Sequence, residues 1–186
     1  MSRVETSIQN IRLKRLNSEG LILDIGGGGE GLVSRIEGER VCAVDIQMNE
    51  IREAQIHGGS SNWVVGDGRY LCFSDSSFDV VTLWFSLGYM RDWTVKKRVL
   101  EEAHRVLKTH GTISILSSKI PDSVEEFVFW ALFTLPDGTL SKTGYGVRGD
   151  QGQTMKKVLD LITPLDFKIL NIEDHEEWFS ITATRS

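Results

Sequence analysis

The stretch LILDIGGGGEGL, residues 21–32, constrains the fold more than any other part of this sequence. An apolar run ends at Asp24 and Ile25, and four consecutive glycines and then Gly31 come close behind it. Glycine lets the backbone turn tightly and approach a ligand, and a strand followed by such a loop is typical of nucleotide-binding α/β proteins. Asp45 ends the next apolar run about 20 residues further on, where an acidic side chain can hold ribose hydroxyls.

Apolar strand-like runs alternate with helix-like stretches along the chain, which predicts parallel βαβ units and an α/β fold. We expect strands near residues 21–26, 40–46, 63–67, 78–85, 112–116, 167–174 and 178–184. Helices are expected near residues 31–36, 49–57, 94–108 and 155–162. Only a few residues join the last two strands, so these strands are expected to pair antiparallel, because parallel neighbours need a long crossover.

We expect a single domain, because 186 residues suffice for one substantial core. About residues 1–20 are expected to form a helical N-terminal segment, and about residues 118–153 a substrate-side insertion or flap. Ser123 and Glu126 have the spacing of a capping box, which predicts a helix start before the apolar stretch FVFWALFTL. That stretch fits a core layer, with a pocket wall or a dimer contact as the alternatives.

Residues 136–153 are rich in glycine and are predicted to form a long loop. Tyr145 and Arg148 within it could belong to a mobile flap over a substrate, or to an ordinary solvated loop.

Composition restricts the partners and the location. A net charge of −5 weakens the case for nonspecific nucleic-acid binding, and no apolar run approaches the ~20 residues of a membrane span. The first 20 residues lack a secretory signal pattern, so we expect a cytoplasmic location. The cysteines and histidines show no ligand spacing, so no metal is expected, and the oligomeric state is left open, a homodimer included.

Two further acidic residues separate a dinucleotide site from other adenosine sites. Asp24 lies two residues before Gly26, where a negative charge suits a cationic ligand better than a pyrophosphate. Asp67 could accept a hydrogen bond from an adenine amino group, and the Gly68 amide could donate to the ring. Taken together, LDIGGGG, AVDI, GDGRYLCFSDSSFDVV and EEAHRVLKTHGTISIL resemble the consecutive motifs of the class I S-adenosylmethionine-dependent methyltransferases, of the methyltransferase type 11-like kind.

This resemblance, which covers residues 21–116, implies a fold and a ligand. The family's fold is a three-layer Rossmann-like sandwich, whose mostly parallel seven-stranded sheet carries one antiparallel strand, here in the C-terminal hairpin. The cofactor would be S-adenosylmethionine and its product S-adenosylhomocysteine. The implied contacts are Asp24 at the amino group, Gly26, Gly27 and Gly28 along the methionine part, Asp45 at the ribose, Ile46 and Met48 around the adenine, Asp67 and Gly68 at its edge, and Phe85 near the sulfonium. The family usually continues GxGxG, whereas here Glu30 stands at the third glycine position.

No catalytic residue is identified, because methyl transfer from a sulfonium mainly requires alignment and the exclusion of water. Tyr89, in the loop WFSLGYMRDW, is the candidate for orienting an acceptor, with packing beside the cofactor as its alternative. Asp92 is expected to cap the following helix, with a catalytic base as its alternative.

We expect methyl transfer to a small-molecule acceptor, because the Asn-Pro-Pro-aromatic signature of amino-directed methyltransferases acting on nucleic acid bases does not occur. One rival hypothesis is an NAD-dependent oxidoreductase, which would share the glycine loop and Asp45. A second is a non-catalytic protein that binds S-adenosylmethionine or docks a partner on the same fold.

Overall fold

The computed structural model describes residues 3–149 and 151–186. Its strands are β1 (Arg3–Glu5), β2 (Gln9–Arg12), β3 (Ile22–Ile25), β4 (Val41–Asp45), β5 (Asn62–Val65), β6 (Phe78–Trp84), β7 (Leu107–Ser118), β8 (Glu126–Thr134), β9 (Leu140–Arg148), β10 (Phe167–Asp174) and β11 (Trp178–Arg185). Its α-helices are α1 (Leu32–Glu37), α2 (Met48–Ile56), α3 (Trp93–Val106) and α4 (Met155–Ile162). Short 3-10 turns cover Gly38–Arg40, Leu87–Tyr89 and Thr163–Leu165.

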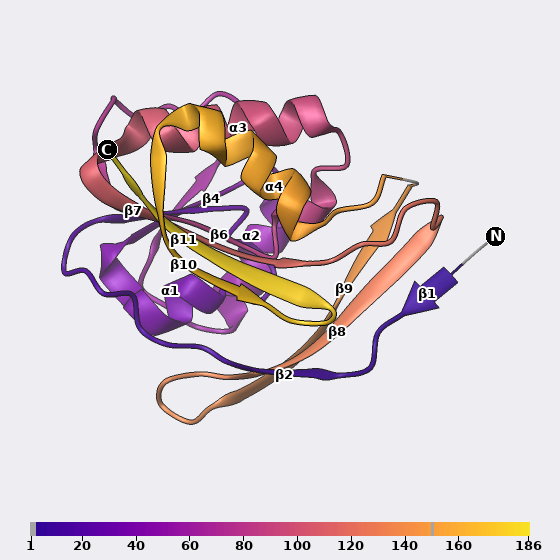
Figure 1. Ribbon diagram of the computed structural model, residues 1–186. Coiled ribbons are helices and arrows are strands. Elements are labelled where there is room, and N and C mark those ends of the chain that lie inside the picture. Colours follow the sequence, from indigo (N-terminus) through magenta and orange to yellow (C-terminus); the bar gives the residue numbers. More distant parts are fainter. Residues whose placement is uncertain (1–2, 150) are drawn as a thin grey trace.

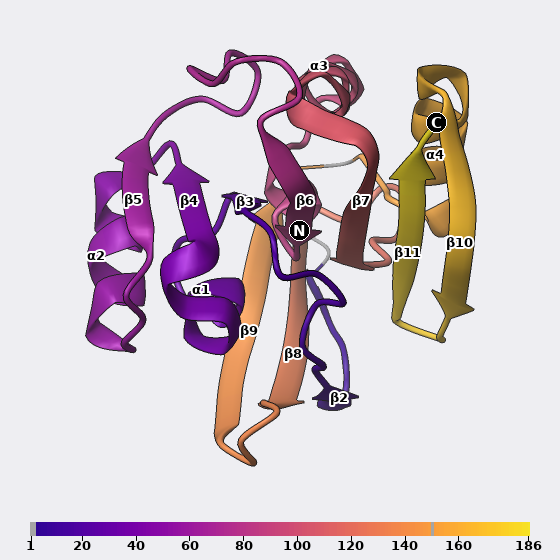
Figure 2. The same ribbon diagram turned by 90° about the vertical axis from the view of Figure 1, so that its left-hand side faces the viewer.

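The larger sheet has seven strands in the order β10-β11-β7-β6-β3-β4-β5 (Figure 2). Strand β11 runs antiparallel to both of its neighbours, and the remaining pairs in this sheet are parallel. Helices α3 and α4 cover one face, and α1 and α2 lie on the other (Figure 1). The predicted α/β fold, with a seven-stranded sheet and an antiparallel strand in a C-terminal hairpin, is confirmed.

Helix α3 shows how the sequence positions these layers. The Asp92 carboxylate accepts a hydrogen bond from the Thr94 amide at 2.7 Å, which confirms the predicted cap. The helix buries an apolar stripe against the sheet, made of Val99, Leu100, Ala103 and Val106. Asp92 is therefore committed to starting the helix.

A second sheet, which the sequence did not predict, is formed by β1, β2, β8 and β9. Strand β8 is its centre: β1 and β2 pair with it in parallel and β9 pairs with it antiparallel. The predicted helical segment at residues 1–20 is therefore wrong over its described part, because β1 and β2 extend along β8 instead. Propensity alone misses such strands, because the pairing partner lies more than 100 residues away.

The capping-box prediction at Ser123 and Glu126 is also wrong, because the apolar stretch that follows is strand β8. Its side chains alternate between buried and partly exposed, with Phe127, Phe129, Ala131 and Phe133 buried. Such a period of two is the pattern of a strand with one face in a core. Ser123 has a φ of 61°, which differs from the extended conformation of a helix N-cap.

The glycine-rich segment predicted as a loop contains strand β9, which pairs with β8 from Glu126↔Arg148 to Thr134↔Leu140. Gly144 is needed there, because a Cβ at this position would lie 2.8 Å from the Trp130 ring. Strands β8 and β9 thus form a hairpin that packs its aromatic face against α1 and the segment after β6. The loop prediction failed because glycine, normally a turn signal, here makes room for a neighbouring strand's side chain.

Within the described part of the chain, no helix combines the length and apolar character needed to cross a membrane.

The second sheet is expected to depend on its buried phenylalanines. We predict that Phe133→Ala lowers the free energy of unfolding by about 3–5 kcal/mol, because it removes a fully buried ring and leaves a cavity. Urea unfolding followed by circular dichroism measures this loss. The control Ile56→Ala, at a side chain that is 84% exposed, should change stability by no more than about 0.5 kcal/mol. A loss as small as the control's would contradict the assignment of β8 to the core.

Candidate functional site

A cavity of about 660 Å³ lies where β3, β4, β5 and β6 end. Parallel strands present their carboxyl ends at one edge of a sheet, and ligands of open α/β sheets bind in the crevice there. The lining consists of residues 24–33, 44–47, 50, 53, 66–69, 84–86, 89–92, 95, 99 and 143–145. The last group comes from β9, so the second sheet closes one side of the cavity.

The structure brings almost all of the predicted cofactor residues into this lining. They are Asp24, Gly26, Gly27, Gly28, Asp45, Ile46, Asp67, Gly68 and Phe85, and the candidate Tyr89 joins them. Met48 lies outside the lining, as the first residue of α2, and is 47% exposed. Of the two flap candidates, Tyr145 lines the cavity, whereas Arg148 lies outside it and pairs with Glu126 at 3.1 Å.

The glycine loop is held between two other elements. Gly26 has a φ of 74°, and a Cβ there would lie 2.4 Å from the Ser86 Cβ, so the loop touches the segment after β6. A Cβ on Gly28 would lie 2.4 Å from the Glu50 Cβ of α2. Glycine without a side chain is thus required at two points on the loop. The amides of Gly26 and Gly27 donate to the Val44 carbonyl, which ties the loop to the end of β4.

Glu30, which departs from the family's glycine pattern, has a structural role. Its carboxylate accepts a hydrogen bond from the Ser141 hydroxyl of β9 and lies 3.4 Å from Arg35 Nη1. Arg35 also donates to Ser141 Oγ at 2.9 Å. These three residues connect the start of α1 to the second sheet. Glu30, at the position where the family has glycine, therefore links the glycine loop to the β9 wall of the cavity.

Asp24 is 3% exposed and accepts a hydrogen bond from the Thr82 hydroxyl at 2.6 Å. Burial raises the pKa of this carboxyl to about 7, and the nearby Asp45 charge adds to the rise, although the Thr82 hydrogen bond opposes it. A cation in the cavity would favour the ionised carboxylate. The ionisation of Asp24 therefore depends on the charge of the ligand in the cavity.

Asp45 and Asp67 sit at the ends of neighbouring strands with different partners. Asp45 accepts from the backbone amides of Gly28 at 3.1 Å and Gln47 at 2.9 Å, which fixes its carboxylate at the rim of the loop. Asp67 is bound by the Arg69 guanidinium at 2.6 Å, and this hydrogen bond holds the pKa of Asp67 below its usual range. Any ligand group at Asp67 would share the carboxylate with Arg69.

Phe85 follows β6 with a φ of 59°, a conformation that costs a bulky residue on the order of 1–3 kcal/mol. Its ring stacks on Tyr145 at 5.1 Å and on Phe129 at 5.4 Å between centroids. The second sheet therefore holds the strained backbone in place. The consequence is that the next residue, Ser86, turns toward the glycine loop.

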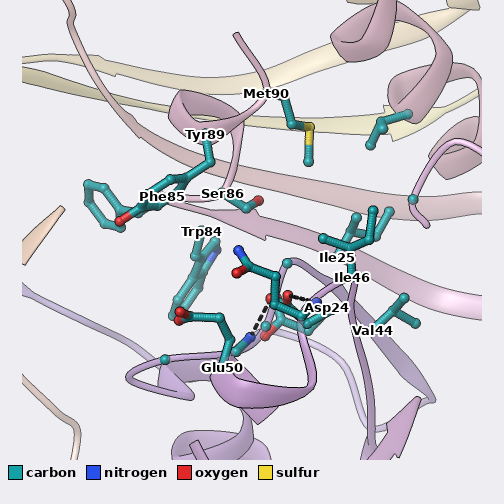
Figure 3. Close-up of a pocket in the computed structure, with 18 of the residues that line it drawn as sticks. Asp24, Ile25, Val44, Ile46, Glu50, Trp84, Phe85, Ser86, Tyr89 and Met90 are labelled. Carbon is teal, nitrogen blue, oxygen red and sulfur yellow. Dashed lines mark hydrogen bonds between the residues drawn. The ribbon is translucent and has the colours of Figure 1, made fainter. Parts of the chain in front are cut away.

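Sequence reasoning missed Trp84, Ser86, Glu50 and the β9 wall, all of which line the cavity (Figure 3). A signal existed for Glu50, because it lies one turn into the helix that follows Asp45, with Glu53 on the same helical face. Tyr145 was a flap candidate, but its neighbours Thr143 and Gly144 gave no signal, because their strand was predicted as a loop.

The cavity is acidic. Its lining contains the carboxylates Asp24, Glu30, Asp45, Glu50, Glu53, Asp67 and Asp92 and the guanidinium groups Arg69 and Arg91. In the described ranges, no group of three or more His, Cys, Asp or Glu side chains is arranged to hold a metal ion. This balance favours a cationic ligand over an anionic one.

The raised pKa of Asp24 predicts a pH dependence of stability in the ligand-free protein. The folded state binds the Asp24 proton more tightly than the unfolded state, so stability falls as the pH rises from about 4 to about 7. Asp24→Asn should remove this loss and gain up to about 4 kcal/mol on the wild type between pH 4 and pH 8. Urea unfolding at both pH values measures it; equal pH dependence of the two proteins would contradict the assignment.

Comparison with known proteins identifies the family of this chain. The family described as "Methyltransferase domain" matches residues 23–115, half of the chain. The demethylmenaquinone methyltransferase of Thermotoga maritima is 33% identical over 109 residues, which cover 55% of this chain and 45% of that protein. The chain thus spans about half the length of the curated relatives it matches.

Solved structures agree on the fold. A protein from Methanosarcina mazei, described among SAM-dependent methyltransferases, superposes with a TM-score of 0.66 at 22% identity, covering 92% of this chain and 94% of that one. A protein from Pyrococcus horikoshii gives a TM-score of 0.67 at 21% identity, covering 92% and 85%. By the family match over half of its length, the chain belongs to the methyltransferase domain family.

Proposed function

We propose that the protein transfers a methyl group from S-adenosylmethionine to a small-molecule acceptor. The observation that carries this proposal is the buried Asp24, whose carboxylate sits beside a bare glycine loop in an acidic cavity. S-adenosylmethionine is cationic at its sulfonium and ammonium groups, and a buried carboxylate stabilises such charges strongly. A pyrophosphate at the same place would meet repulsion from Asp24 and Asp45.

The residues present fit this cofactor. A Cβ on Gly26 or Gly28 would collide with Ser86 or Glu50, so the loop stays free of side chains there and can lie along the methionine part. Asp45 offers acceptor oxygens to the ribose hydroxyls, and Ile25, Val44 and Ile46 supply the apolar surface for an adenine at the other end (Figure 3). Asp67 and Gly68 lie at the adjoining strand end for the adenine edge. We propose each of these contacts with the cofactor.

The bound cofactor supplies an activated methyl group, and the chain's own residues align the acceptor and exclude water. The acceptor side of the cavity is lined by Thr143–Tyr145 of β9 and by Trp84–Ser86. Partial burial and the nearby Glu50 carboxylate raise the pKa of Tyr89 to about 12, so its hydroxyl stays protonated at neutral pH. Tyr89 can therefore orient an acceptor by donating a hydrogen bond but does not serve as a base.

A small acceptor fits a cavity of about 660 Å³, which is within the usual range of about 300–1,000 Å³ for ligand sites. The relative from Thermotoga maritima is named for a quinone acceptor, which supports a small-molecule class without identifying the molecule here. We further propose a cytoplasmic location and no nucleic-acid partner, given the net charge of −5.

The first test compares cofactors by isothermal titration calorimetry. The full chain is expected to bind S-adenosylhomocysteine and to show no comparable heat with NADH, because Asp24 and Asp45 favour a cation over a pyrophosphate. Binding of NADH alone would contradict the proposal and support an oxidoreductase. Tight S-adenosylhomocysteine binding without turnover across broad acceptor pools would support the non-catalytic alternative.

The second test concerns the ribose contact. Asp45→Ala should weaken S-adenosylhomocysteine binding by about 1.5–3 kcal/mol, the range for hydrogen bonds to charged groups. Asp160→Ala, which removes an exposed carboxylate on α4, is the matched control and should leave the affinity unchanged. Unchanged affinity in a folded Asp45→Ala protein would remove Asp45 from the site.

A further inference from the structure

The acidic cavity contains one carboxylate pair without a partner among the residues that the structure describes. Most other lining carboxylates are occupied: Glu30 by Arg35 and Ser141, Asp67 by Arg69, Asp92 by the first turn of α3, Asp45 by two backbone amides and Asp24 by Thr82. Glu50 and Glu53 of α2 remain. In residues 3–149 and 151–186, no group forms a hydrogen bond or ion pair with either carboxylate.

Glu50 is the more enclosed of the two, being half-buried, whereas Glu53 is exposed. Burial raises the pKa of Glu50, and the like charges of Glu53 and Asp45 add to the rise. A partly buried carboxylate without a partner is unfavourable unless a ligand supplies the missing charge. The bound S-adenosylmethionine already has Asp24 for its amino group in the proposed function, which leaves Glu50 for a second molecule.

Ser86 gives an independent sign of a ligand at the same place. Its side chain lines the cavity and is 6% exposed, yet its Oγ has no hydrogen-bond partner among the described residues. A buried hydroxyl is normally satisfied, so an unpartnered one in a cavity wall indicates a missing polar group. The strained backbone at Phe85, held by the second sheet, is what turns Ser86 into this position.

Aromatic side chains surround this part of the cavity. Figure 3 shows Glu50 beside Trp84, with Phe85, Ser86 and Tyr89 on the other side of the hollow. Tyr145 of β9 closes the wall, with its ring 6.4 Å from that of Tyr89. Indole and phenol faces attract cations, and the attraction is strongest where water is excluded. Carboxylate, hydroxyl and aromatic faces together match the chemistry of an ammonium group.

We propose that the acceptor of this methyltransferase site is a small molecule with a protonated amino group, bound by the Glu50 carboxylate and the Ser86 hydroxyl against Trp84. An ammonium has three N–H donors, so it can pair with the Glu50 carboxylate and still donate to another acceptor in the cavity wall. A neutral alcohol would leave the Glu50 charge unpaired, and an anion would be repelled. The inference rests on the proposed function, because it assigns the second ligand of the same cavity.

The test uses the full chain saturated with S-adenosylhomocysteine and three probes of similar size: phenethylamine, 2-phenylethanol and phenylacetate. Isothermal titration calorimetry is expected to show phenethylamine binding at least about tenfold tighter than the other two. Glu50→Gln should abolish this preference while changing the affinity for S-adenosylhomocysteine by less than about twofold. The control Glu176→Gln, which removes the same charge at the exposed β10–β11 turn, should keep the preference.

Ser86→Ala provides a second variant and should weaken phenethylamine binding about three- to tenfold, because one hydrogen bond is lost. Equal binding of the three probes, no binding of phenethylamine, or a preference that survives Glu50→Gln would overturn the inference. Loss of S-adenosylhomocysteine binding in Glu50→Gln would also overturn it, since Glu50 would then serve the cofactor. Failure of the unmodified chain to bind S-adenosylhomocysteine is a different result, which overturns the proposed function itself.

Discussion

The close approach of the glycine loop to two other elements is the constraint on which the site depends. The loop touches Ser86 after β6 through Gly26 and the α2 helix through Gly28, at distances that leave no room for side chains. The glycine loop is thereby held against the segment after β6 on one side of the cavity and against α2 on the other. Asp24 and Asp45 come close to the loop because they lie at the carboxyl ends of the neighbouring strands β3 and β4. The cavity is negatively charged because the strand order places β3 and β4, which carry these two carboxylates, side by side.

The second sheet completes the cavity that the larger sheet begins. Its aromatic side chains stack on Phe85 and support a backbone conformation that a bulky residue rarely adopts. Glu30 and Ser141 connect the same sheet to the glycine loop. The wall on the acceptor side is therefore anchored at two points, Phe85 and the glycine loop.

Much of the larger sheet could be predicted from the sequence, because its strands are continuous apolar runs separated by recognisable helices. Helix α3 was predictable from its cap at Asp92 and its apolar spacing. The cofactor residues at the strand ends followed from the resemblance to the methyltransferase motifs. The second sheet could not be predicted, because β1 and β2 are short and gain their stability from a distant partner, β8. The glycines of β9 predicted a loop, so Tyr145 was expected only as a flap residue and the strand that carries it was not predicted.

We propose that the acidic cavity at the ends of β3, β4, β5 and β6 holds S-adenosylmethionine. The most direct measurement is a crystal structure of the full chain with S-adenosylhomocysteine. We expect the amino end to lie beside Asp24 and the loop from Gly26 to Gly28, with the ribose at Asp45. A ligand bound elsewhere, or one whose ribose lies away from Asp45, would contradict it.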